Sequence, residues 1–141
     1  MAREKRGPPP PSDPDQGIYQ GRSVARRFLS PEGWTILVGR TASDNDVLTL
    51  RLASPKDFWL HVAAESGSHV LIRNPDGADR PPRDVLQMAA SLAAGHSRAR
   101  SGGRVAVHWT QKSEVSKPRG LGPGKVELGR HRTVHASPRR D

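Results

Sequence analysis

Short apolar runs separated by turn-forming residues are the main pattern of the chain from about residue 25 onward. Two of these runs, at 27–29 and 35–38, flank the segment Ser30-Pro31-Glu32-Gly33 and predict a β-hairpin. Further strands are predicted at 57–62, 69–72, 105–110, 115, 126–128 and 133–135. Short strands joined by turns that contain proline and glycine indicate a sheet whose strands are largely antiparallel.

A helical spacing of apolar residues at 82–99 predicts the clearest helix of the chain. One stripe of this helix consists of Val85, Met88, Ala89, Leu92, Ala93 and His96. Its many alanines are small enough for the helix to lie close against a sheet. A shorter helix is predicted at 45–53, capped by Ser43 or Asp44 and ended by Pro55. The expected class is therefore α+β: a largely antiparallel mixed sheet packed against one main Ala-rich helix and a short helix.

Composition divides the chain into one domain and two tails. Only 33% of the 141 residues are hydrophobic, so the core has to come from part of the chain. Residues 1–24 contain a run of four prolines and few apolar side chains, which predicts a disordered basic tail. One folded domain is expected at 25–136, followed by a flexible basic end at 137–141.

Positive charge suggests the kind of partner, because 23 Lys and Arg residues against 14 Asp and Glu residues give a net charge of +9. The excess is uneven: residues 28–111 carry nine basic and eight acidic groups, whereas residues 112–141 carry eight and three. Such a basic segment predicts a polyanion as partner, since neutralising phosphates releases their counterions. A basic tail that only improves solubility is the alternative.

The sequence predicts neither a membrane protein nor a protein that depends on cysteine chemistry. The sequence has no cysteine, which excludes disulfides and thiolate chemistry. No apolar run approaches the roughly 18 residues of a membrane span, and the N-terminus lacks the hydrophobic region of a signal peptide. We therefore expect a soluble cytoplasmic protein with no membrane partner.

The segment 57–62 carries an unusual set of polar side chains. If it forms a strand, its apolar residues at 58, 60 and 62 point to one face. The other face then presents a carboxylate, an indole and an imidazole, from Asp57, Trp59 and His61. An exposed indole favours base stacking, worth about 1–3 kcal/mol, and Asp57 could accept from a base edge or orient His61. Alternatively, Trp59 packs under a loop while its two polar neighbours bond buried backbone groups.

Metal binding and catalysis have less support in the sequence. His61, His69 and Asp57 provide fewer ligands than the four of a structural zinc site, so no metal or other cofactor is predicted. Ser68 is only a sequence neighbour of His69, which does not make a catalytic triad. General acid–base chemistry by His61 with Asp57 is reasonable, but nothing in the sequence supplies the rest of such a site. No catalytic residue is assigned.

A glycine-rich loop at 120–125 is flanked by Lys112, Lys117, Arg119 and Lys125. The loop lacks the Lys-Ser or Lys-Thr ending of a nucleotide P-loop. Backbone amides together with lysines suit a nucleic-acid phosphate, which is the predicted ligand of this loop. A tight turn between two edge strands, with its charges in solvent, is the alternative.

Several of these motifs, taken together and in order, resemble the NFACT-R domain, also called DUF814. They are the segments 32–40 and 45–49, Asp57-Phe58-Trp59-Leu60-His61, Gly67-Ser68-His69-Val70, Lys117-Pro118-Arg119-Gly120 and Pro123-Gly124-Lys125-Val126. The predicted Ala-rich helix and the strand from residue 105 lie between them, so the resemblance covers about residues 25–136. The order of the motifs makes the resemblance specific.

The resemblance implies RNA or ribonucleoprotein binding, with Asp57, Trp59 and His61 as a family signature. The domain usually lies in the C-terminal part of larger proteins, such as ribosome quality-control factors that recruit tRNA to stalled large subunits. The large N-terminal domain and coiled-coil arms of those proteins have no counterpart in the 141 residues, so we expect a stand-alone form. We do not infer for this chain the peptide-tail elongation that the larger proteins carry out. The sequence leaves open whether the chain acts with a separate protein that resembles the N-terminal domain of those proteins.

The sequence thus predicts an RNA-binding module for tRNA, rRNA or the large ribosomal subunit, acting in translation quality control or RNA metabolism. Its predicted RNA contacts are Arg40, Asp57, Trp59, His61, Ser68, His69, Lys112, Lys117, Arg119 and Lys125. Basic residues at 130, 132, 139 and 140 would extend this surface. Two alternatives stay open: an RNA-processing or RNA-modifying enzyme that uses His61 with Asp57, and a protein-interaction module. The sequence does not determine which RNA is bound, the metal content or the oligomeric state.

Overall fold

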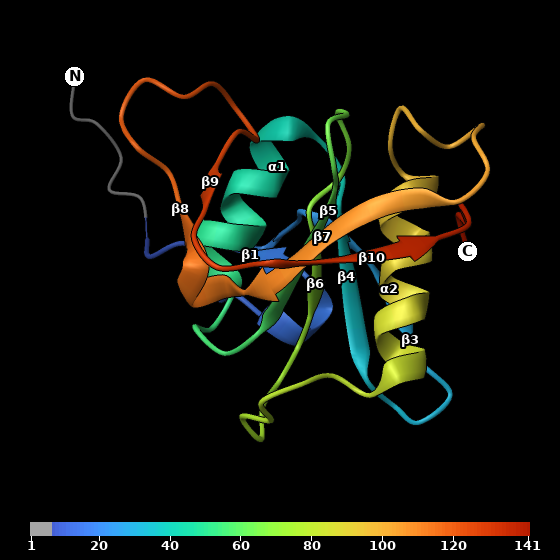
Figure 1. The fold of residues 1–141 in the computed structure, drawn as a ribbon. Coiled ribbons are helices and arrows are strands. Elements are labelled where there is room, and N and C mark those ends of the chain that lie inside the picture. Colours follow the sequence, from blue (N-terminus) through green and yellow to red (C-terminus); the bar gives the residue numbers. More distant parts are fainter. Residues whose placement is uncertain (1–6) are drawn as a thin grey trace.

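A six-stranded antiparallel sheet forms the centre of the computed structural model, which describes residues 7–141 (Figure 1). The strands follow the order β10-β7-β5-β6-β4-β3 across the sheet. Their bounds are Ala25–Leu29 (β3), Thr35–Gly39 (β4), Phe58–Val62 (β5), Val70–Ile72 (β6), Val105–Gln111 (β7) and Arg132–Ala136 (β10). Each coincides with a predicted strand, and the predicted α+β class with a largely antiparallel sheet is confirmed.

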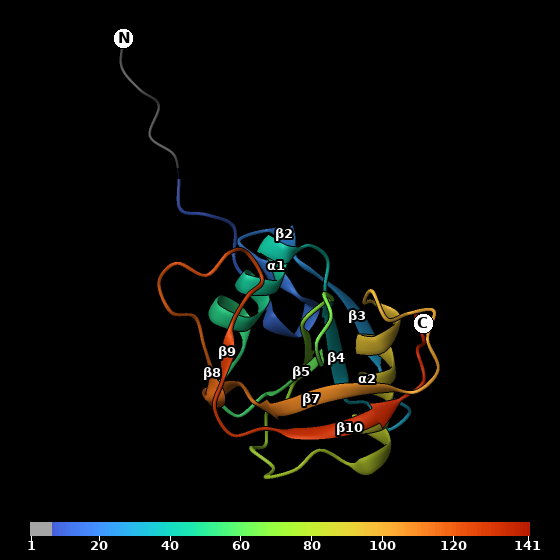
Figure 2. The ribbon, with the colours of Figure 1, turned by 45° about the horizontal axis from the view of Figure 1, so that its top comes forward.

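Helices cover both faces of the sheet (Figures 1 and 2). α2, at Arg83–Gly95, packs on one face, where its buried alanines meet the apolar residues of β5. α1, at Ala42–Val47, and the π-helix η2 that continues it at Leu48–Leu52 lie over the other face. The core on this second side contains Trp59 and Leu37. Within residues 7–141, no helix combines the length and the apolar content needed to cross a membrane.

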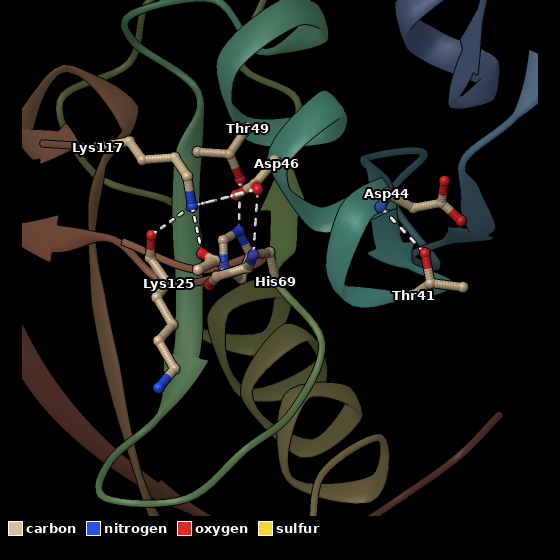
Figure 3. A network of polar contacts seen from close by, with 9 residues as sticks. Thr41, Asp44, Asp46, Thr49, His69, Lys117 and Lys125 are labelled. Carbon is tan, nitrogen blue, oxygen red and sulfur yellow. Dashed lines mark hydrogen bonds and ion pairs between the residues drawn. The ribbon is translucent and has the colours of Figure 1, made fainter. Parts of the chain in front are cut away.

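α1 begins earlier than the sequence predicts. Its cap is Thr41, whose Oγ1 accepts a hydrogen bond from the backbone N–H of Asp44 at 3.1 Å (Figure 3). The prediction of a helix at 45–53 capped by Ser43 or Asp44 is therefore wrong at its start. Thr, Ser and Asp all satisfy the free amides of a first helical turn, so composition did not distinguish these candidates. The helical segment ends at Leu52.

The segment before β3 has regular structure from residue 13 onward, which differs from the predicted disorder of residues 1–24. It forms a 3-10 turn at Pro14–Gln16 and a two-stranded hairpin of β1 (Ile18–Tyr19) and β2 (Arg22–Ser23). Val24 after the hairpin is fully buried. Low apolar content predicted disorder, but the few apolar residues of this segment complete a core that distant elements supply. Residues 1–6 lie outside the described part of the chain.

The C-terminal third adds two short strands and a terminal segment that is hydrogen-bonded to α2. A 3-10 turn at Lys112–Glu114 leads to β8 (Val115–Ser116), which pairs with β9 (Glu127–Leu128) and frames the glycine-rich loop. Residues 137–141 were predicted to be a flexible end. They lie instead against α2, where the N–H of Arg139 donates to the carbonyl oxygen of Ser91 at 2.9 Å. Both ends of the predicted domain therefore extend beyond 25–136.

Candidate nucleic-acid interface

The polar face of β5 is covered by other segments. Side chains along the strand alternate as predicted, but Trp59 is only 2% exposed and Asp57 only 1%. The prediction of an exposed indole is therefore wrong, because Trp59 packs in the second core and cannot stack on a base at the surface. His61 stays partly exposed. It is the one member of the predicted trio, among the described residues, that a ligand can reach directly.

A chain of hydrogen bonds leads from Trp59 to the glycine-rich loop. The indole Nε1–H donates to Oγ1 of Thr49 at 3.1 Å, and this hydroxyl lies 2.7 Å from Nδ1 of His69. Nε2 of the same imidazole lies 2.8 Å from the carbonyl oxygen of Gly124. A carbonyl only accepts, so Nε2 carries the proton and the Thr49 hydroxyl donates to Nδ1. His69 is thus a neutral imidazole with both ring nitrogens bonded (Figure 3).

Burial is the main reason why the pKa of His69 falls from 6.5 to about 4. The carbonyl of Gly124 and the charge of Asp46 oppose this shift, while the nearby His61 and Lys117 add to it. At neutral pH the imidazole is uncharged and does not attract phosphate. Its contribution is to fix the glycine-rich loop above β5.

The ammonium group of Lys117 bonds two carbonyl oxygens of the glycine-rich loop and the Asp46 carboxylate. This ammonium lies 3.2 Å from the carboxylate of Asp46, and 2.6 and 2.8 Å from the carbonyl oxygens of Gly122 and Lys125 (Figure 3). The same carboxylate accepts the N–H of Gly124 at 3.1 Å. An ammonium has three N–H donors, and all three have partners here. A phosphate contact through Lys117, as predicted, does not fit this geometry.

Asp57 joins the turn before β5 to the turn after β6. Its carboxylate accepts the N–H of Ser54 at 2.9 Å and that of Asn74 at 2.8 Å, and it forms an ion pair with Arg73. His61 is not among these partners, and its Nδ1 lies instead 2.6 Å from the backbone carbonyl of the next residue. The acid–base pair on which the enzyme alternative depends is therefore not formed.

Four imidazoles line an open cleft of about 830 Å³ beside β5 and β7, here named the histidine cleft: His61, His69, His108 and His131. His61 and His108 are cross-strand partners, and the ring centroids of His108 and His131 are 4.5 Å apart. Trp59 stacks on His61, with 6.0 Å between ring centroids and 13° between planes. Burial lowers the pKa of His61 and of His108. Within residues 7–141, no three His, Cys, Asp or Glu side chains are grouped to hold a metal ion.

A second hollow of about 340 Å³, here named the arginine pocket, lies beside the histidine cleft. Its arginines are Arg26, Arg40, Arg98, Arg100 and Arg140. Arg98 and the segment 66–67 line both hollows, so the two form one continuous surface. Ser68 contributes to its floor, because its Oγ donates to the carbonyl oxygen of Gly39 at 2.7 Å.

The structure brings only part of the predicted site together. Trp59, His61, His69 and Lys125 line the histidine cleft, and Arg40 and Ser68 line the arginine pocket. Lys112 and Arg119 line neither hollow. Arg98, His108 and His131 were not predicted as site residues. His108 lies in a predicted strand, but its position opposite His61 follows from the pairing of β5 with β7, which local sequence does not reveal.

Residues 25–130 match the sequence pattern of the NFACT protein RNA binding domain. The chain belongs to the NFACT-R family. The matched region contains β5, the glycine-rich loop and nearly all of the residues of the histidine cleft. RNA binding is therefore shown for this NFACT-R chain at the level of its family.

Relatives of this NFACT-R chain include ribosome quality control proteins. It is 37% identical over 118 residues to the Rqc2 homolog RqcH of Bacillus subtilis, covering 84% of this chain and 20% of that protein. It is 34% identical over 91 residues to the ribosome quality control complex subunit NEMF homolog of Drosophila melanogaster, covering 64% of this chain and 9% of that protein. The chain thus spans about a fifth or less of the length of these relatives.

The fold also matches a solved relative. The C-terminal part of the fibronectin/fibrinogen-binding protein from Streptococcus suis aligns with a TM-score of 0.76 and 34% sequence identity. The alignment covers 84% of this chain and 47% of that one. The NFACT-R architecture described above is therefore shared by an independent structure.

Proposed function

We propose that this NFACT-R chain binds structured RNA across the histidine cleft and the arginine pocket. The observation that carries the proposal is a continuous row of cations without acidic partners. Within residues 7–141, Lys125 and Arg98 at the cleft have no carboxylate oxygen within 4.0 Å, and neither do the other arginines of the pocket. Glu65 and Glu127 also line the cleft, but neither is paired with these cations. RNA phosphates supply the acceptors that the unpaired cations require.

His61 replaces Trp59 as the proposed aromatic contact. Its ring is partly exposed and stacks on the buried indole of Trp59. Because burial lowers the pKa of His61, its ring is mainly neutral at pH 7. Histidine rings stack on the unpaired bases of RNA. In this arrangement the cations contact the RNA backbone and the imidazoles contact its bases.

The proposed ligand is tRNA or ribosomal RNA, bound in the cytoplasm in the context of the large ribosomal subunit. Support comes from the relatives, which are named as ribosome quality control proteins. Because the chain corresponds to about a fifth of RqcH, we propose for it the RNA-binding role within such systems and not the whole activity of the larger proteins.

Binding of tRNA at increasing KCl concentration tests the proposal. The wild-type chain should bind at low salt and lose affinity as salt rises, because RNA binding releases counterions. His61→Ala should weaken binding by about tenfold, since stacking on one base is worth about 1–3 kcal/mol. His135→Ala is the matched control, because His135 is exposed on β10 outside the cleft.

Two results would contradict RNA binding. One is the absence of tRNA and rRNA binding by the wild-type chain even at low salt. The other is recovery of the same protein partners from ribosome preparations before and after nuclease treatment, which would favour the protein-interaction alternative.

A further inference from the structure

The arginine pocket collects guanidinium groups from four separate segments. Arg26 lies in β3, Arg40 follows β4, Arg98 and Arg100 follow α2, and Arg140 is near the C-terminus. No aspartate or glutamate lines the hollow. Like charges brought together from distant parts of a chain repel one another unless an anion neutralises them. The composition of the pocket therefore points to an anionic ligand.

Glycines hold the floor of the pocket at close packing distance. A Cβ atom on Gly39 would lie 1.9 Å from Oδ1 of Asn45, and one on Gly95 would lie 2.0 Å from the carbonyl oxygen of Arg139. A Cβ atom on Gly67 would lie 2.7 Å from the Cβ of Ser97, just after α2. The end of β4 thus touches α1, the loop before β6 touches the residues just after α2, and the end of α2 touches the C-terminal segment. The arginines of these segments start from fixed backbone positions.

Several backbone amides around the pocket already have partners. Their hydrogen bonds run from Arg40 to Val24, from Ser68 to His96 and from Arg98 to Ser66, at 3.1, 3.0 and 2.8 Å. An anion-binding nest requires free backbone N–H groups. Recognition in this pocket therefore depends mainly on the arginine side chains.

Internal hydrogen bonds orient two of these side chains and leave most of their donors available. Nε of Arg40 donates to Oγ of Ser23 at 3.2 Å, and Nη1 of Arg100 donates to the carbonyl oxygen of Ser97 at 3.3 Å. A guanidinium has five N–H donors, so each group can still bind an oxyanion with two parallel hydrogen bonds. Phosphate matches this geometry better than a single-point anion does.

We propose that the arginine pocket is the seat of one phosphate group of the RNA that the histidine cleft binds. This inference rests on the function proposed above. Because Arg98 and the segment 66–67 line both hollows, a strand with its phosphate in the pocket places a neighbouring base in the cleft. The pocket thus sets the register of the RNA strand on the domain.

A charge-matched pair of double variants tests the proposal with a short single-stranded RNA. Arg40→Gln/Arg140→Gln removes two pocket charges, and Arg51→Gln/Arg80→Gln removes two charges from exposed positions outside both hollows. The pocket variant should bind about tenfold more weakly at about 0.1 M KCl, with a log–log salt slope smaller by about one to two. The control should lose no more than about threefold. Thermal unfolding checks that both variants fold.

Inorganic pyrophosphate provides the second measurement. It should shift the amide NMR signals of Gly67 and Ser68 in the wild type and in the control, but not in the pocket variant. Equal RNA affinity and equal shifts in both double variants would overturn the phosphate seat while leaving RNA binding intact. Pyrophosphate binding without any RNA binding by the wild type would overturn the RNA phosphate as ligand and the proposed function together.

Discussion

His69 connects the layers that cover the second face of the sheet. Its two ring nitrogens bond Thr49 and Gly124, and its backbone N–H donates to Oδ1 of Asn45 at 3.0 Å. A proton on Nδ1 would compete with the hydroxyl hydrogen of Thr49, which already points at that nitrogen. The same hydroxyl also accepts from Trp59. Protonation of His69 therefore opposes the folded state.

The free energy of unfolding is expected to fall as the pH drops from about 6.5 to about 4. In this window the unfolded chain protonates His69 and the folded chain does not, so the unfolded state binds more protons. This pKa difference corresponds to about 3 kcal/mol in the free energy of unfolding. The contribution is fully present above pH 6.5 and is lost below pH 4. Urea unfolding of His69→Gln should show a flatter pH profile than the wild type.

The control for this prediction is His135→Gln, because His135 is exposed on β10. It should reproduce the wild-type profile. Parallel profiles for the wild type and His69→Gln would mean that His69 does not titrate differently in the two states.

The residues of β5 show what a sequence can predict at this scale. Period-two alternation correctly placed Trp59 and His61 on the face opposite Phe58, because this depends only on strand geometry. Whether that face is exposed depends on what lies over it. The cover comes from η2 and from the glycine-rich loop, which is more than fifty residues away along the chain. Local sequence therefore predicted the face but not its burial.

The glycine-rich loop has no regular structure, and its shape comes from internal polar contacts that are partly buried. Lys117 bonds two carbonyl oxygens within the loop and the Asp46 carboxylate of α1. The Asp46 carboxylate also accepts from Gly124. The loop is thereby fixed both to itself and to α1, and it forms one wall of the histidine cleft.

Lys117→Met should loosen this loop without unfolding the sheet. The change removes an ammonium with three acceptors and leaves the Asp46 carboxylate without its ion-pair partner. Hydrogen exchange of the Gly124 amide should accelerate by at least about tenfold, since losing a bond to a charged group costs about 1.5–3 kcal/mol. Arg119→Met, an exposed change immediately before the loop, should leave this exchange rate unaltered. Unchanged protection in Lys117→Met would contradict the role of the lysine in closing the loop.

Regular elements were predicted where a local pattern is sufficient. The strands of the sheet follow from alternation and lie where expected. α2 follows from a helical stripe but ends at Gly95, four residues before the predicted end, because the chain turns there to pair residue 97 with Gly67. The π-helical turn at Leu48–Leu52 has no sequence signal of its own. The hairpin of β1 and β2 was missed because a two-residue strand is too short to show alternation.

At the scale of the whole molecule, the sheet separates two cores, and the N-terminal segment belongs to the second one. Val24 is fully buried, and Tyr19 packs against the same cluster. Residues 13–24 are thus part of the folded unit, although the family match begins at residue 25. The folded unit and the matched region are not the same.

A chain that starts at residue 25 should be less stable than one that starts at residue 12. The longer deletion removes Val24 and Tyr19 and opens the second core, and losses of this kind cost about 2–5 kcal/mol. The shorter deletion keeps both residues. Urea unfolding of the two truncated chains measures the difference directly, and equal midpoints would show that residues 13–24 add nothing to stability.

Charge was predictable as a total but not as a location. The excess of basic residues correctly indicated a polyanion class of partner at the family level, and the sequence placed most of that excess after residue 112. The arginine pocket instead draws Arg40, Arg98 and Arg100 from the nearly neutral middle of the chain. Their meeting depends on how the end of β4 packs against the end of α2, which no count of residues can show.

The order of the strands has a consequence for contacts between copies of the molecule. β3 and β10 are the two edges of the sheet, and each leaves a row of backbone groups where a further strand could add. Arg26 and Arg27 are exposed on one edge and Arg132 on the other. Two copies that met edge to edge would bring these like charges together, which disfavours growth of the sheet into aggregates. The basic character that suits a nucleic acid thus also protects the fold from pairing with itself.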